Sequence, residues 1–187
     1  ALKLTPEHPG LRYSLALALH AAGRADESLA LYAEALTVDP GNAQLHFDYA
    51  RALSDAKKND EAIAQYQETL ALNPGHLDAL VNLGVEFFYA KNDKTAALDC
   101  YDRAIQADPG HARAHFNRGY LQARDGQLEA AVEDYRKALA TSPGDAPTHL
   151  NLGQALEKLG RADEALQEYE AAVAADPALS DAHHNLG

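Results

Sequence analysis

Prolines recur along this chain at an almost constant spacing. The series comprises Pro6, Pro40, Pro74, Pro109, Pro143 and Pro177, which are 34, 34, 35, 34 and 34 residues apart. Four of them are followed by glycine, and a Pro-Gly pair after a helical pattern marks a helix end and a turn. A fixed period of this length is typical of repeat proteins, whose short units become stable by stacking on their neighbours.

Other columns align when position 1 is placed three residues after each proline. Position 24 is tyrosine in all five complete units, at Tyr32, Tyr66, Tyr101, Tyr135 and Tyr169. Positions 8 and 20 are always small and position 27 nearly always, while apolar residues at 21, 24 and 28 follow the spacing of one helix face. Each unit is therefore predicted to be two short helices joined by a turn. The extra residue of the 35-residue unit is expected in that turn, where insertions cost least.

The alignment divides the chain into units with definite limits. The complete units are predicted at 9–42, 43–76, 77–111, 112–145 and 146–179. Residues 1–8 match the end of a preceding unit, and residues 180–187 match the start of the first helix of a following one. We therefore expect the chain to be a segment of a longer array or of a larger protein.

These columns resemble the tetratricopeptide repeat family over essentially the whole chain. That family has leucine at position 7, a small residue at 8, alanine at 20 and 27, an aromatic residue at 24 and proline at 32. The resemblance implies an all-α fold, a right-handed α-solenoid of stacked antiparallel helix pairs. Position 4, often tryptophan in the family, is histidine in four units here. Arg118 and Gln122 replace apolar residues, so the fourth unit is expected to be the softest.

The resemblance also implies that the first helices line a concave groove through positions 2, 5, 6, 9, 12 and 13. An apolar stripe with arginines is typical of a binding surface. The candidate peptide-binding residues are Tyr13, Phe47, Arg51, Val81, Asn82, Val85, Phe88, Tyr89, Arg113, Phe116, Asn117, Tyr120, Arg124, Asn151 and Asn185. Among them, Val81, Val85, Phe88, Tyr89, Phe116 and Tyr120, with Arg113 and Arg124 nearby, are expected to form one groove floor. The alternative is that some of these side chains pack against the neighbouring first helix and stiffen the array.

Position 6 carries asparagine in four successive units. An amide offers two donors and an acceptor, so an asparagine in each repeat could hold the backbone of an extended peptide. This column is similar to the asparagine ladder of the repeat domain in O-linked N-acetylglucosamine transferases. The alternative is that each amide forms its hydrogen bonds within its own unit. The carboxylate clamp, with which some members of the family hold chaperone C-termini, is not matched. Asn117 stands where the clamp has a basic residue, and Phe47 occupies another clamp position.

Histidines and acidic residues suggest chemistry until they are placed in the repeat. His111 and His115 have metal-like spacing, but the histidines recur at positions 34 and 4, which indicates helix capping and packing, so no metal or cofactor is expected. Cys100 has no histidine fixed beside it and is interpreted as an inert or surface thiol. The Asp-Glu pairs at the starts of second helices are expected to interact with the helix dipole and to cap free N–H groups.

The net charge of −12, from 28 acidic and 16 basic residues, argues against nucleic acid and anionic membranes as partners. No stretch of about 18 apolar residues occurs, so membrane insertion is not expected. We predict a non-enzymatic scaffold that binds a partner peptide in the groove. The alternatives are a substrate-recruiting arm of a larger enzyme such as a glycosyltransferase, and a module that self-associates through its terminal repeats. The composition suggests a soluble bacterial protein of the cytoplasm or periplasm.

Overall fold

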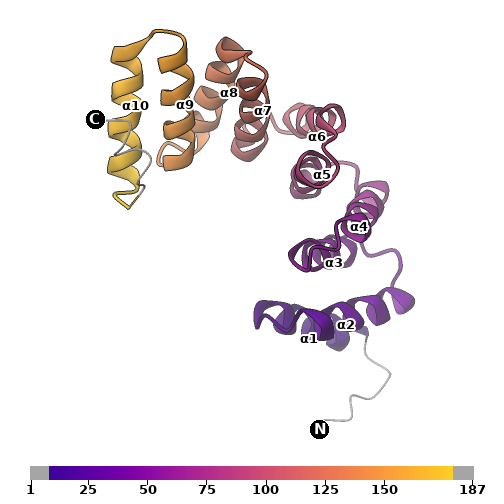
Figure 1. The fold of residues 1–187 in the computed structure, drawn as a ribbon. Helices are drawn as coiled ribbons and strands as arrows, with labels where there is room; N and C mark the ends of the chain where they lie inside the picture. Colours follow the sequence, from indigo (N-terminus) through magenta and orange to yellow (C-terminus); the bar gives the residue numbers. More distant parts are fainter. Residues whose placement is uncertain (1–8, 179–187) are drawn as a thin grey trace. The chain divides into compact units, whose positions relative to one another are not determined.

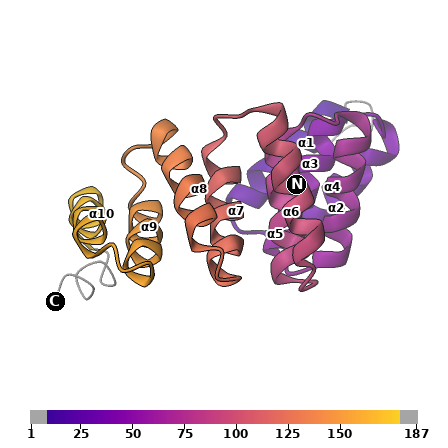
Figure 2. The ribbon, with the colours of Figure 1, turned by 90° about the horizontal axis from the view of Figure 1, so that it is seen from above.

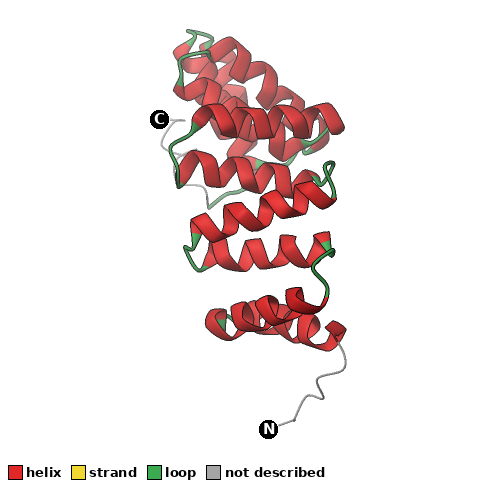
Figure 3. Cartoon of the chain, turned by 90° about the vertical axis from the view of Figure 1, so that its right-hand side faces the viewer, coloured by secondary structure: helices red, strands yellow, loops and turns green. Residues whose placement is uncertain are grey.

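The computed structural model describes residues 9–178, which form ten α-helices joined by short loops and contain no strand (Figures 1 and 3). The chain forms two compact units, each larger than a single repeat, and the boundary between them lies between Asp93 and Lys94. From here on, 'unit' refers to these two parts and 'repeat' to one helix pair. The first unit contains α1 (Pro9–Ala21), α2 (Ala25–Val38), α3 (Ala43–Asp55), α4 (Asn59–Leu72) and α5 (Leu77–Tyr89). The second contains α6 (Lys94–Ala107), α7 (Ala112–Arg124), α8 (Leu128–Thr141), α9 (Ala146–Lys158) and α10 (Ala162–Ala175). The predicted all-α fold class is confirmed.

Within each unit, every helix packs on the next one along the chain, and Figure 2 shows the pairs α7–α8 and α9–α10 of the second unit side by side. No helix in the described part of the chain is long and apolar enough to cross a bilayer. The terminal segments 1–8 and 180–187, and with them Asn185, lie outside the described residues. Expectations that concern them are therefore not addressed by the structure.

The turn between the two helices of a repeat contains a left-handed residue, each time two residues before the second helix begins. Glycine occupies it at Gly23, Gly126 and Gly160, with φ of 73° to 77°. Lys57 and Asn92 take its place in the other two repeats, with φ of 60° and 53°. The turn after α5 comprises residues 90–93, one more than the others, so the predicted site of the insertion is confirmed.

Side chains at position 34 cap the N-termini of the first helices. Asn42 and Asp145 each accept a hydrogen bond at 3.0 Å from the backbone N–H three residues later, at Leu45 and Thr148. The Nδ1 atoms of His76 and His111 accept the equivalent bonds at 3.3 Å. Each bond satisfies one of the N–H groups that a helix start leaves without an intrahelical partner. The capping role predicted for this histidine column is confirmed for these two members.

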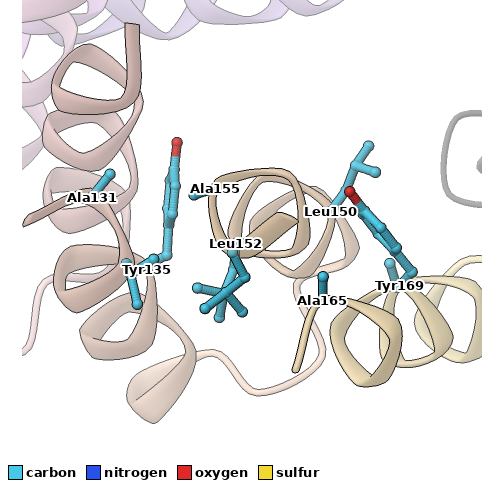
Figure 4. Close-up of a cluster of buried hydrophobic side chains, with 10 residues drawn as sticks. Ala131, Tyr135, Leu150, Leu152, Ala155, Ala165 and Tyr169 are labelled. Carbon is cyan, nitrogen blue, oxygen red and sulfur yellow. The ribbon is translucent and has the colours of Figure 1, made fainter. Parts of the chain in front are cut away.

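The core of the second unit is built from the small residues and tyrosines that recur in each repeat, and Figure 4 shows several of them together. Tyr135 and Tyr169 are 0% and 3% exposed, and Leu152 lies buried among the same helices. Gly119 and Gly153 allow the close approach, because a Cβ on either would contact the ring of Tyr135 or Tyr169 at 3.1 or 2.5 Å. Each ring therefore fills the space that the small residue leaves.

Candidate functional site

The aromatic residues at position 5 pack on the position-24 tyrosine of their own repeat. Ring centroids are 6.3 Å apart for Tyr13 and Tyr32, 6.0 Å for Phe47 and Tyr66, and 6.0 Å for Phe116 and Tyr135. This separation is typical of favourable aromatic pairs. At these three residues, position 5 is therefore a packing position that joins the two helices of one repeat, whereas the alternative interpretation had the groove residues pack against the neighbouring first helix.

Two of the candidate peptide-binding residues are buried, Val81 of the predicted groove floor and Phe47. Val81 is 0% exposed and Phe47 is 7% exposed, so the prediction that they face solvent was wrong. The ring of Phe47 also lies 4.5 Å from that of His76, the residue that begins α5. Phe47 thus lies between both helices of its own repeat and the start of the next one, where its ring is removed from water.

The remaining predicted residues keep part or much of their surface exposed. Tyr89 is 69% exposed, and Arg51, Arg113 and Arg124 are also exposed. The partly buried group is Tyr13, Asn82, Val85, Phe88, Phe116, Asn117, Tyr120 and Asn151. The members on α1, α3 and α5 belong to the first unit and those on α7 and α9 to the second. The predicted groove floor takes residues from both units, and it stays a prediction.

A pocket of about 220 Å³ lies between α3, α4 and α5 of the first unit. Its lining residues are Arg51, Ser54, Asp55, Tyr66, Asn82, Val85 and Glu86. Asn82 forms a hydrogen bond with Tyr66, and the Ser54 hydroxyl donates one to Glu86. Arg51 and Asp55 have partners outside the lining, Asp48 and His20, and the lining contains one arginine and two carboxylates.

A second pocket, of about 110 Å³, occupies the equivalent place between α7, α8 and α9 of the second unit. Its lining residues are Tyr120, Ala123, Arg124, Leu128, Tyr135, Asn151, Gln154, Ala155 and Lys158. The Arg124 guanidinium lies 5.9 Å from the centre of the Tyr120 ring, within cation–π range. Both pockets use positions 9, 12, 13 and 24 of one repeat and positions 6, 9 and 10 of the next, so they are one recurring feature of the repeat.

The asparagines at position 6 make hydrogen bonds inside the protein. The Asn151 amide donates to the carbonyl oxygen of Pro147, one turn earlier in α9, at 2.8 Å. In the second repeat the position is Asp48, which is 7% exposed and accepts hydrogen bonds from Tyr13 and Gln44. These bonds agree with the scaffold interpretation of the column, while a peptide-binding role for it stays a prediction.

Histidines at position 4 join the loop before a repeat to its second helix. One ring nitrogen bonds the carbonyl oxygen of the repeat-ending proline at 2.9 to 3.1 Å, and the other bonds the residue at position 23 at 2.6 to 2.8 Å. The three sets are His46 with Pro40 and Gln65, His115 with Pro109 and Asp134, and His149 with Pro143 and Glu168. Both nitrogens of each ring are thus engaged in structural bonds.

The sequence did not reveal a buried ionic cluster in the second unit. Asp134 on α8 is 2% exposed and accepts two hydrogen bonds at 2.7 Å from Arg118 on α7, whose third donor reaches Asp102 on α6 at 2.7 Å. His115 adds a bond to Asp134 at 2.8 Å. Burial raises the pKa of Asp134, but the hydrogen bonds from Arg118 and His115 outweigh it and leave the pKa below its usual value. One feature of the sequence could have indicated this cluster: Arg118, at a position that is usually apolar, and Asp134, at position 23, occur in the same repeat.

Cys100 is buried, and two of the acidic residues at helix starts form ion pairs with nearby arginines. Cys100 is 2% exposed, and burial raises the pKa of its thiol to about 11, so it is an inert buried thiol rather than a surface one. Glu27 and Glu164 lie in the first turns of α2 and α10, where they pair with Arg24 and Arg161. No side-chain cap forms at the start of either helix, so the predicted capping role was wrong there. The carboxylates do face the positive end of the helix dipole.

Solved structures with the same fold are similar to this chain at low sequence identity. A fragment of MamA from Desulfovibrio magneticus RS-1 has a TM-score of 0.78 at 21% identity, covering 91% of this chain and 96% of that one. YrrB, described as a repeat protein with an unusual peptide-binding site, has a TM-score of 0.72 at 21% identity, covering 92% and 89%. PilW, a type IV pilus biogenesis factor, has a TM-score of 0.80 at 22% identity, covering 92% and 80%.

Sequence comparison gives the family. No curated protein matches the chain in sequence. One tetratricopeptide repeat profile matches residues 47–88 and 87–146, and a second matches residues 19–67 and 122–186. Each covers more than half of the chain, and together with the helix pairs and the fold neighbours they agree with the resemblance of the repeat columns. The chain belongs to the tetratricopeptide repeat family.

Proposed function

We propose that this protein is an interaction scaffold that binds an extended segment of a partner protein along its first helices. The observation that carries the proposal is the recurrence of one pocket, built from the same repeat positions, in both units. Pockets built from equivalent repeat positions suit a chain in extended conformation, whose side chains also recur at regular intervals. Family membership supports the same class of function, as does the peptide-binding site described for YrrB.

The two pockets offer the mixture of groups that peptide recognition uses. Each combines a tyrosine edge, an amide at position 6 and a long cationic side chain near the opening, and such groups are enriched at protein interfaces. The surrounding helix faces are held by the buried tyrosines, so the pockets exist before a partner arrives. Preformed sites lose less entropy on binding than sites that must first be ordered.

In this proposal the protein binds its partner and catalyses no reaction on it. The carboxylates near the pockets are engaged with arginine, serine or tyrosine partners, and the buried thiol of Cys100 is held in its protonated, unreactive form. These groups stabilise the scaffold and shape its surface.

Tyr120→Glu tests the proposal in the second unit. The 187-residue chain is labelled and applied to an array of twelve-residue peptides, and binding peptides are remeasured by fluorescence anisotropy. Tyr120→Glu should weaken binding at least about tenfold, because it removes the ring from the pocket wall and places a carboxylate beside Arg124, where it competes with the peptide for the cations. Leu166→Glu, a similar change at an exposed site on α10, is the control and should bind as the wild type does. Equal capture of the same peptides by wild type and Tyr120→Glu would contradict the proposal.

A further inference from the structure

The pocket of the second unit contains a buried donor without an acceptor. Tyr135 is 0% exposed, and its hydroxyl has no hydrogen-bond partner among the residues that the structure describes. Burial raises the pKa of this phenol, so the hydroxyl keeps its proton and remains a donor at neutral pH. Figure 4 shows the oxygen directed away from Leu152 and the core, beside Ala155, which is another lining residue of the pocket. An unsatisfied buried donor is costly, and a ligand oxygen reaching it would remove that cost.

The charge of the lining residues indicates the kind of ligand. Arg124 and Lys158 stand at the wall on α7 and α9, and no carboxylate occurs among the described residues that line the pocket. Asn151 and Gln154 add amide groups on the same side of α9. A set composed mainly of N–H and O–H donors with two cations is complementary to an anion with several acceptor oxygens, such as a carboxylate.

The equivalent pocket of the first unit differs in the charge of its lining and in the bonding of its tyrosine hydroxyl. Asp55 and Glu86 there outnumber the single cation Arg51, and the Tyr66 hydroxyl already has a hydrogen bond with Asn82. In the second unit the Asn151 amide is directed to the Pro147 carbonyl instead, which leaves Tyr135 without the partner that Tyr66 has. The same repeat positions thus produce one pocket that repels a carboxylate and one that attracts it. The cationic pocket occurs in a chain of net charge −12, so it is not a by-product of overall composition.

We infer that the pocket between α7, α8 and α9 binds an aspartate or glutamate side chain of the partner peptide, with Arg124 and Lys158 attracting the carboxylate and the Tyr135 hydroxyl donating to it at the pocket floor. This inference rests on the proposed peptide-binding function and adds to it the chemistry of one peptide residue. The pocket of about 110 Å³ has room for one side chain rather than a longer segment. The peptide backbone would stay outside, along the first helices.

Paired peptides test the inference. Twelve-residue peptides with one glutamate are compared with the same peptides carrying glutamine, all N-acetylated and C-terminally amidated so that the side chain is the sole carboxylate. Wild type should bind the glutamate version about tenfold more tightly, the ratio expected for one charge-assisted hydrogen bond. Lys158→Gln and Tyr135→Phe should each reduce that ratio severalfold. Lys137→Gln, which removes an exposed charge on α8 outside the pocket, should leave it unchanged.

The outcomes separate the inference from the function on which it rests. Peptides that bind and are weakened by Tyr120→Glu, yet show no difference between glutamate and glutamine, would overturn the inference and leave the proposed function standing. So would a preference that survives in Lys158→Gln or in Tyr135→Phe, or tighter binding only when the amide is replaced by a free C-terminal carboxylate. An array in which nothing binds, or in which Tyr120→Glu changes nothing, would overturn the proposed function itself.

Discussion

Gly153 lies directly against the tyrosine ring of the second helix of its repeat. A Cβ at this position would lie 2.5 Å from Cε1 of Tyr169, whose hydroxyl is held by Glu157 at 2.7 Å. At Gly119 the corresponding distance to Tyr135 is 3.1 Å, and the first two repeats carry Ala16 and Ala50 at the same position. The room left for a Cβ beside the tyrosine ring therefore differs between the repeats of Gly153 and Gly119, although position 8 is always small.

We predict that Gly153→Ala lowers the free energy of unfolding by about 1–2 kcal/mol. Overpacking costs roughly 1–3 kcal/mol, and the better helix propensity of alanine returns up to about 1 kcal/mol. Gly119→Ala is the control and should be close to neutral, because its contacts, 3.1 Å to the Tyr135 ring and 3.2 Å to Cβ of Asp134, need shifts of only a few tenths of an ångström, which the better helix propensity of alanine offsets. Urea unfolding followed by circular dichroism measures both variants. A Gly153→Ala protein as stable as wild type would show that the α9–α10 contact is looser than the structure indicates.

The cluster around Asp134 makes stability depend on pH in the acid range. Its pKa is lower in the folded chain than its usual value of 3.8, so the unfolded chain binds the proton first. The contribution of the cluster is therefore complete above about pH 4 and is lost as the pH falls through the folded value. Arg118 retains Asp102 as a second partner, but that carboxylate is 59% exposed and stabilises the guanidinium less.

We predict that Asp134→Asn lowers the free energy of unfolding at pH 7 by about 3 kcal/mol, because the buried donors of Arg118 and His115 lose their shared acceptor. The difference between wild type and variant should narrow when the same urea titration is repeated near pH 3. Asp102→Asn, at the exposed end of the cluster, should cost no more than about 1 kcal/mol at either pH. A gap for Asp134→Asn that is equally wide at both pH values would refute this account.

At the scale of elements, the turns between paired helices impose one backbone geometry on different residues. Lys57 has φ of 60° where three other repeats have glycine, and its N–H bonds the Ser54 carbonyl at 2.9 Å. The following N–H, of Lys58, reaches back to Leu53 at 2.9 Å. These bonds end α3 in the same way that a helix usually ends at glycine. The helix end therefore requires the left-handed conformation whether or not the residue favours it.

We predict that Lys57→Gly raises the free energy of unfolding by about 0.5–1 kcal/mol. The left-handed conformation costs a residue with a Cβ roughly 1–2 kcal/mol, and the greater entropy of glycine in the unfolded chain cancels part of the gain. Asn92→Gly should gain less, because asparagine tolerates this conformation better than lysine does. Thermal and urea unfolding measure the series. A destabilised Lys57→Gly protein would mean that the lysine side chain contributes more than its backbone costs.

At the scale of the whole molecule, the repeat period predicted the helices, their turns and the insertion site, because each depends on residues within one unit. The buried tyrosines followed from the same period. The burial of Val81 and Phe47 did not, and for Phe47 the reason is that its ring also packs on His76, at the start of the following repeat. Arg118 was interpreted as a weakness for a similar reason: its partners, Asp134 and Asp102, lie on two different helices.

The sequence alone determined that the chain forms helix pairs of the tetratricopeptide type and which columns pack between them. Local periodicity decides this, because a helix buries the face that its own spacing of apolar residues creates. Only the tertiary structure decided which polar groups find partners. Tyr66 and Tyr135 occupy the same column, yet one hydroxyl is bonded and the other is not. That difference depends on where a side chain of the next repeat directs its amide, which no column of the sequence records.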